Sequence, residues 1–329
     1  MMVPTGWSSR WKVALPVLAL LAVLSVATAK AADNKSDRPA GPIAKGQRMF
    51  TCAHSFHAFV YGLVAEMAKQ AGIPDHESAG FSGIGGSRVI QHWEKEDDKH
   101  QAKAVVGSGK VDVLTLSPIW LPDEGIDSFA KLGFEHNPNI RILVQEYWMP
   151  NDTYEPKYPL DTKKQVDHNA TDLAELRKKT DQYCRDMEAY CTGINKRLGK
   201  DILLVVPVGE ASIALREKIV AGKAPGLTKQ WDLFRDMWGH PQPPLQVLDG
   251  YCYFAEIYRR SPVGLPVPTV LTKMTTLVPS PKVKLPPNPT PHVITGQEKV
   301  DLNRLLQEIA WETVTHHPMT GLTPDSPAK

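Results

Sequence analysis

The sequence predicts an α/β protein built on a five-stranded parallel sheet with helices on both faces. Short, almost continuously apolar runs alternate with longer segments whose apolar residues recur at helical spacing. Continuous apolar runs are typical of strands buried on both faces, and the alternation indicates parallel strands joined by helices. The predicted strands are 49–52, 76–81, 110–116, 140–145 and 201–207.

Helical spacing predicts the segments between and after these strands. In 58–71 the apolar residues Phe59, Leu63 and Met67 share one helix face, and Gly72 ends the segment. Right-handed crossovers place every loop that follows a strand at one edge of the sheet, where open α/β proteins bind ligands. The other predicted helices are a short one carrying Val89 and Trp93, followed by 94–106, 123–132, 171–198, 211–221, 246–258 and 298–314.

The N-terminus has the features of an export signal. Arg10 and Lys12 precede an apolar run over 13–29, and small residues around Ala29 supply a cleavage site. We therefore expect a signal peptide at 1–31 and a periplasmic or secreted mature protein with no membrane span after cleavage. An uncleaved N-terminal anchor is the alternative interpretation.

The rest of the chain is long enough for one large domain with a substantial core. A polar, proline-bearing stretch predicts a flexible lead-in at 32–46, followed by a single domain at 47–329. Within that domain, 279–291 is rich in proline and predicts an extended surface strap before the C-terminal helix.

Charge and cysteine content exclude some classes of protein. The formal net charge is +2 and is spread along the chain, without the basic stripe typical of nucleic-acid binding, so no nucleic-acid partner is expected. Cys184 and Cys191 are too far apart to bridge within one straight helix. Cys52 and Cys252 have apolar neighbours and are expected in the core.

Ser55 is the candidate nucleophile. It lies where the first predicted strand turns into a helix that begins near His57, in the stretch QRMFTCAHSFHAF. Backbone amides converge at such a turn and favour negative charge, which suits a serine that attacks a carbonyl group. The alternative is a serine that only caps the helix.

His240 and Asp236 are the candidate base and its orienting acid. They are four residues apart in a loop that precedes a late helix, close enough for the carboxylate to fix the imidazole tautomer. In the alternative interpretation, Asp236 caps or pairs with Arg235, and His240-Pro241 is a simple turn.

The amides of Ser55, Gly85 and Gly86 are candidate oxyanion donors, since glycine lets backbone N–H groups approach a ligand closely. As a dinucleotide fingerprint the glycine cluster lacks its last glycine, because Arg88 stands there, and as a phosphate loop it lacks the lysine. A tight turn before a helix is the structural alternative.

These features together resemble the SGNH (GDSL-type) hydrolase family, in a branch of exported bacterial proteins. The resemblance spans about 47–265 and is carried by AHSFHAFV, GFSGIGGSRVIQHW and RDMWGHPQPPLQVLDGYCYFAEIYRRSPVGLP. It implies a flavodoxin-like three-layer sandwich and an esterase, often a carbohydrate deacetylase, with Ser55 as nucleophile, His240 as base and Asp236 as its orienter. The resemblance implies an ester of a small molecule or polysaccharide as substrate.

The sequence departs from the family pattern in three places. Ala53-His54 replaces the usual Gly-Asp before the serine, and three residues separate Asp236 from His240 where the family has two, which leaves Asp232 as a reserve orienter. The asparagine-bearing block after the third strand is replaced by TLSP at 115–118. The third oxyanion donor is therefore open between Ser117 and Asn151, and a catalytically weak or inactive glycan-binding protein on the same fold is the alternative function.

Other chemistry is less favoured by the sequence. His54 and His57 lack a third ligand at suitable spacing, so no metal or other cofactor is expected. A metal-dependent enzyme that uses the histidine-rich edges is the rival hypothesis, and such an enzyme would lose activity to chelators. The pair His316-His317 is an alternative base or a helix end. Trp238 is expected to face substrate, whereas large aromatics such as Trp93, Trp120 and Trp148 more often belong to the core.

Overall fold

The structure is a computed structural model and describes residues 41–95, 97–153, 166–277 and 292–323. The predicted signal peptide, most of the lead-in and the predicted strap at 279–291 lie outside these residues. Residues 37–329 belong to one compact unit. Within the described chain, no helix combines the length and apolar character needed to cross a membrane.

The predicted fold class is confirmed: five parallel strands form one sheet in the order β2-β1-β3-β4-β5. This is the flavodoxin-like strand order, in which β2 is added on one side of β1 and the later strands are added on the other side, beginning with β3. The residues of β3, β4 and β5 are almost all buried, as their apolar sequences predict, whereas the glycine-containing β2 is a partly exposed edge strand. The strands are β1 (Arg48–Ala53), β2 (Glu77–Gly83), β3 (Val113–Leu116), β4 (Arg141–Gln145) and β5 (Leu203–Val206).

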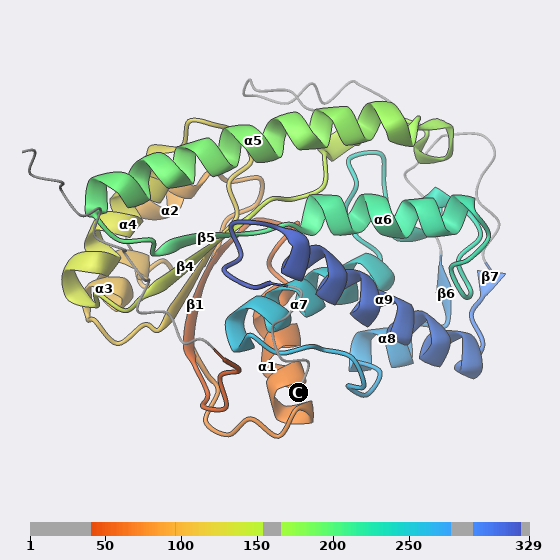
Figure 1. The fold of residues 1–329 in the computed structure, drawn as a ribbon, viewed down its shortest axis with the longest axis horizontal. Coiled ribbons are helices and arrows are strands. Elements are labelled where there is room, and N and C mark those ends of the chain that lie inside the picture. Colours follow the sequence, from red (N-terminus) through yellow and green to blue (C-terminus); the bar gives the residue numbers. More distant parts are fainter. Residues whose placement is uncertain (1–40, 96, 154–165, 278–291, 324–329) are drawn as a thin grey trace, which may run out of the picture. The chain divides into compact units, whose positions relative to one another are not determined.

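Helices cover both faces of the sheet and give three layers (Figure 1). One layer contains α2 (Val89–Glu94), α3 (Ala102–Gly107), α4 (Glu124–His136) and α5 (Leu173–Leu198). The other contains α1 (Val60–Gln70), α6 (Val208–Val220), α7 (Pro243–Tyr258), α8 (Thr269–Lys273) and α9 (Gly296–His316). Beside them are a two-stranded antiparallel sheet and three short 3-10 helices, namely β6 (Thr276–Leu277), β7 (His292–Val293), η1 (Pro150–Asp152), η2 (His168–Ala170) and η3 (Gln230–Leu233).

Several predicted boundaries are wrong for local reasons. The helix predicted at 94–106 is interrupted, because the Asp97 carboxylate accepts hydrogen bonds from the Lys99 amide and the His100 ring and so competes with helical bonding. Helix α7 begins at Pro243, three residues earlier than predicted, since proline suits the first turn of a helix. Helix α8 and the β6–β7 pair were not predicted.

The predicted boundary between lead-in and domain at residue 47 also differs from the structure. The last residues of the predicted flexible lead-in contact the domain, because the Ile43 amide donates to the Tyr258 carbonyl at 2.8 Å. Gly46 is buried, and a β-carbon there would lie 2.1 Å from the backbone of Asp75. The lead-in is therefore packed at least from Ile43 onward.

All four cysteines are buried and unpaired. Cys52 and Cys252 lie in the core as predicted, and Cys184 and Cys191 lie on the buried face of α5. Burial raises the pKa of each thiol above its usual value, so none of them is an activated thiolate.

Candidate active site

Ser55 lies on a turn between β1 and α1, at the carboxyl edge of the sheet. The amides of His57 and Ala58 both donate to the His54 carbonyl, and this turn delays the start of α1 to Val60. The predicted helix start near His57 is therefore wrong, and Phe59, not Ser55, occupies the N-cap position. Ser55 is exposed, and its hydroxyl is directed to a histidine instead of a helix end.

His240 supplies that histidine. The Oγ of Ser55 lies 2.9 Å from Nε2 of His240, although the two residues are 185 positions apart. The loop that carries His240 closes like a hairpin, since the Arg235 amide donates to the His240 carbonyl and Phe234 bridges to Pro241. The sequence prediction that these two side chains meet at one sheet edge agrees with this geometry.

Gly239 allows the tight return of this loop. Its φ of +90° is a conformation that a side chain would strain, and its carbonyl accepts a 2.8 Å hydrogen bond from Nε1 of Trp148. Trp148 stacks on Phe56, and Phe56 contacts the ring of His240 edge-on. Phe56 and Trp148 thus pack the His240 ring against the turn that carries Ser55.

Asp236 orients His240 from the same loop. Its Oδ2 lies 2.7 Å from Nδ1 of His240, and its Oδ1 accepts from the amides of Trp238 and His240. Partial burial raises the pKa of Asp236, but the hydrogen bonds from the His240 ring and from the amides of His240 and Trp238 outweigh it and hold the pKa below its usual value. The reserve orienter Asp232 instead accepts from the amides of Thr228 and Lys229.

The proton positions follow from these partners. A carboxylate only accepts hydrogen bonds, so Nδ1 of His240 carries the ring proton and Nε2 is left with a lone pair facing Ser55. The Ser55 hydroxyl donates to that lone pair. This is the arrangement that a serine nucleophile and its general base require.

A buried ionic network that sequence reasoning missed braces the Asp236 backbone. Nε2 of His168 lies 3.0 Å from the Asp236 carbonyl, while its Nδ1 lies 2.8 Å from Oδ2 of Asp152. Both ring nitrogens face oxygens that only accept, so the His168 ring links Asp152 to the Asp236 backbone. Arg216 donates to both carboxylate oxygens of Asp152, at 2.7 and 2.9 Å.

This network also sets the charge of Asp152. Burial raises the pKa of Asp152, but the hydrogen bonds and charges of His168 and Arg216 reverse this and hold the pKa well below its usual range. The carboxylate is therefore ionised. In the sequence these residues look like ordinary surface charges, and no spacing pattern connects them.

The glycine turn after β2 lies at the same edge of the sheet. The hydrogen bonds of this turn use the amides of Ile84 and Ser87, and the exposed residues Gly85 and Gly86 form its tip, with Gly86 at φ +60°. His92 holds both ends of the turn, because its ring lies 2.8 Å from the hydroxyls of Ser82 and Ser87. The hydroxyl of Ser87 is buried and bonded within the fold.

Ser117 follows β3, next to the end of β1 in the sheet. Its Oγ lies 2.8 Å from Nε2 of His54, and Nδ1 of His54 accepts from the Phe56 amide. Burial lowers the pKa of His54 to about 3, with nearby histidines adding to this, so the ring is neutral. Its proton is then on Nε2 and is donated to Ser117, which leaves the Ser117 hydroxyl hydrogen available for another acceptor.

Asn151, the other candidate for the third oxyanion donor, lies in η1 beside the His240 loop. Its amide donates to the Trp238 carbonyl at 3.3 Å, and its backbone has φ +52°. The side chain is buried, and among the described residues its Oδ1 has no hydrogen-bond partner. The positive φ and the buried amide distinguish Asn151 from an ordinary loop asparagine.

The remaining histidine candidates have other partners. His57 is buried between Gln145 and Thr115, its Nε2 lying 2.9 Å from the threonine hydroxyl, and so belongs to a polar layer within the core. The His316 ring contacts the Glu312 carbonyl at 2.7 Å, and the His317 ring contacts Glu188 at 3.1 Å. Among these histidines, His240 is the one whose ring contacts the Ser55 hydroxyl.

The tryptophans divide as expected between core and surface. Trp120 and Trp148 are buried, and Trp93 packs edge-on against Phe129. Trp238 is 42% exposed, and its ring centroid lies 6.0 Å from that of His240. Trp238 is thus a large exposed aromatic surface next to the candidate base.

Comparison with known proteins adds little to this geometry. No protein-family model matches the sequence, and no curated protein matches it. A solved DUF4886 family protein from Bacteroides uniformis aligns with a TM-score of 0.46 and 11% identity, over 83% of this chain and 95% of that protein. A gut microbial diltiazem-metabolizing enzyme aligns with a TM-score of 0.35 and 14% identity, over 64% of this chain and 46% of that enzyme. Neither description names the SGNH family, and at these scores the likenesses carry no argument about function.

Proposed function

We propose that this protein is an exported serine esterase of the SGNH type, which hydrolyses an ester through an acyl-enzyme. The single observation that carries the proposal is the relay from the Ser55 hydroxyl to Nε2 of His240 and from Nδ1 of His240 to Asp236, at 2.9 and 2.7 Å. Its members come from two distant segments that the sheet topology brings to one edge. Export is supported by Arg10, Lys12 and the apolar run after them.

The first half of the reaction follows from the proton positions. The Ser55 oxygen attacks the ester carbonyl carbon while its proton moves to Nε2 of His240, and Asp236 stabilises the resulting imidazolium. When the tetrahedral intermediate collapses, the alcohol leaves with the proton from His240. Water then attacks the acyl-serine with the same base, and the acid is released as Ser55 recovers its proton.

The oxyanion of the intermediate needs donors at the same edge. The candidates are the amides of Ser55, Gly85 and Gly86 together with a third donor from Ser117 or Asn151. The His54 tautomer favours Ser117, because it leaves the serine hydroxyl free to donate. Each such donor typically contributes about a hundredfold to a thousandfold in rate.

An acetyl ester of a carbohydrate is the substrate class that we favour. Two features support it: the resemblance to the family, and the exposed ring of Trp238 beside His240, which offers an apolar face of the kind on which sugars stack. No cofactor enters the proposed reaction.

Labelling with a fluorophosphonate probe tests the proposal directly, because the probe reacts with activated serines independently of the natural substrate. The parent protein is expected to carry one adduct, on Ser55, and the variants Ser55→Ala and His240→Ala to carry none. Ser128→Ala is the matched control, because Ser128 is a partly exposed serine on α4 whose hydroxyl bonds only to the Glu124 carbonyl among the described residues. Absence of labelling in the parent would favour a glycan-binding protein, and labelling that survives Ser55→Ala would place the nucleophile elsewhere.

A further inference from the structure

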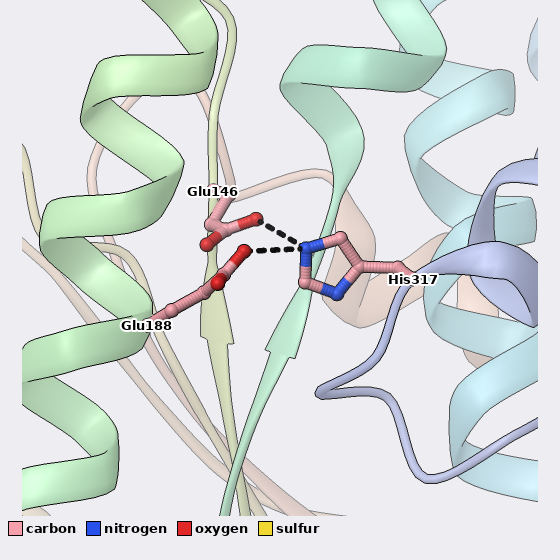
Figure 2. A group of neighbouring side chains, drawn as sticks. All are labelled: Glu146, Glu188 and His317. Carbon is pink, nitrogen blue, oxygen red and sulfur yellow. Dashed lines mark hydrogen bonds and ion pairs between the residues drawn. The ribbon is translucent and has the colours of Figure 1, made fainter.

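A second cluster of chemically active side chains lies apart from the Ser55 relay. Glu146 directly follows β4, Glu188 lies in the middle of α5, and His317 follows the last turn of α9. Figure 2 shows both carboxylates directed at the same imidazole nitrogen. Nε2 of His317 lies 3.1 Å from Oε1 of Glu188 and 3.5 Å from Oε2 of Glu146.

Glu146 lacks the hydrogen bonds that a buried carboxylate needs. It is 0% exposed, and among the described residues its oxygens have no ordinary N–H or O–H donor, with only the weak thiol donor of Cys184 beside them. Nε2 of His317 lies 3.5 Å from Oε2 of Glu146, which is long for a hydrogen bond. A buried carboxylate without hydrogen bonds is costly, so its persistence in a well-packed region points to a missing cationic partner.

The three side chains converge on one point. The carboxyl groups of Glu146 and Glu188 both face Nε2 of His317, and Glu188 and His317 line a pocket together with Glu210. Carboxylate oxygen and imidazole nitrogen are both common ligands of divalent metal ions.

The three ligand atoms have the spacing of a metal site. One atom from each side chain lies within 4.8 Å of the other two, and no other group of three or more such side chains was found in the described part of the chain. Two carboxylate oxygens and one imidazole nitrogen suit zinc and related divalent ions. A pocket of about 450 Å³, lined by Glu188, His317 and Glu210, gives an ion and a further ligand access from solvent.

We propose that Glu146, Glu188 and His317 bind one divalent transition-metal ion of the zinc class, which ties the end of β4 to α5 and to the C-terminus of α9. In the metal-free chain the Met319 amide donates to Nδ1 of His317 at 3.3 Å, so Nε2 carries the ring proton. Metal binding at Nε2 moves that proton to Nδ1, and the long contact with Met319 is given up.

The sequence did not predict this site. Glu146 and His317 stand 171 positions apart, and each residue has the appearance of an ordinary surface charge at the end of a strand or helix. The expectation that the protein has no metal rested on His54 and His57, which are both hydrogen-bonded within the fold.

Calorimetric titration of the chelator-treated full chain with Zn²⁺ tests the proposal. The parent is expected to bind one zinc ion per chain, and Glu146→Gln, Glu188→Gln and His317→Gln are each expected to lose at least tenfold in affinity. Glu312→Gln is the matched control, because Glu312 is an exposed glutamate that lines the same pocket outside the cluster, and its affinity should stay within twofold of the parent.

Two further measurements keep the test decisive. Zinc should raise the melting temperature of the parent and of Glu312→Gln but not of the three ligand variants, whose melting curves in chelator also report whether they fold. Substitution with Co²⁺ should give the visible absorption of a low-symmetry protein site in the parent and not in His317→Gln. Failure of the parent to bind zinc stoichiometrically, or equal binding by folded ligand variants, would overturn the proposal and indicate adventitious surface zinc.

Discussion

Replacement of Asp152 by asparagine should strongly destabilise the protein. The carboxylate accepts two hydrogen bonds from Arg216, one from His168 and one of 2.5 Å from Thr171. Asparagine would leave the buried Arg216 guanidinium without its counter-charge and His168 without the carboxylate that orients it. Breaking a buried ion pair from one side costs about 3 to 5 kcal/mol, which for a chain of this size lowers the melting temperature by about 6 to 10 °C.

The pH dependence gives the prediction a second test. Because the pKa of Asp152 is lower in the folded than in the unfolded chain, its stabilisation is complete above about pH 4 and is lost as the pH falls toward the folded value. The gap in unfolding free energy between parent and Asp152→Asn should therefore narrow below pH 4, by up to about 1.4 kcal/mol per pH unit.

Calorimetric melting of both proteins from pH 3 to pH 8 measures this gap. Asp127→Asn is the matched control: Asp127 pairs with Lys131 and Arg197 near the surface, so its loss should cost no more than about 1 kcal/mol. Since His168 also holds the Asp236 carbonyl, Asp152→Asn should in addition slow fluorophosphonate labelling of Ser55. A change in melting temperature at pH 7 no larger than that of the control would refute the reasoning.

Three further predictions concern the relay and the core. Asp236→Asn should lower kcat/KM for a simple acetyl ester such as 4-nitrophenyl acetate by about a hundredfold to ten-thousandfold with little change in melting temperature, because the base loses its orienting carboxylate; an unchanged rate would remove Asp236 from the relay. Ser117→Ala should lower the kcat for that ester by about a hundredfold or more and Asn151→Ala much less, if Ser117 is the third donor, and the opposite ranking would assign the role to Asn151. Asp249 is fully buried without a hydrogen-bond partner in the described chain, and burial raises its pKa well above its usual value, so the folded protein holds a proton that the unfolded chain releases above about pH 4. Stability of the parent should therefore fall relative to Asp249→Asn as the pH rises above about 4, and melting curves in which Asp249→Asn gains nothing with rising pH would contradict this.

Most of the sheet could be predicted from sequence because β1, β3, β4 and β5 are short apolar runs, whereas β2 is a polar, glycine-containing edge strand. The run ILLVVP around β5 is too short for a buried helix and too apolar for a loop. Parallel strands then place their carboxyl ends at one edge, and this puts Ser55 and the glycine turn after β2 in the same region. His240 follows α6 and η3, so its place at this edge depends on the path of the loop that carries it. The 2.9 Å contact between Oγ of Ser55 and Nε2 of His240 could not be predicted, because it depends on the tight loop around Gly239.

The buried ionic groups could not be predicted in this way. Asp152 and Arg216 lie in segments of mixed polarity, and a charged residue in such a segment is usually solvated. Glu188 lies in α5, a helix so polar overall that its buried face is hard to recognise from sequence. Pairing of such residues depends on long-range packing between helices, which has no periodic signal along the chain.

The stacking of Trp148 on Phe56 gives this protein a built-in optical reporter. Phe56 is the residue after Ser55 and also contacts the His240 ring, so the indole is one aromatic ring away from the place where an acyl group would be attached. The fluorescence emission of Trp148 should change when the Phe56 ring shifts. The variant Trp238→Phe would remove the emission of Trp238, which also lies beside His240. Acylation could then be followed in real time without any label on the substrate.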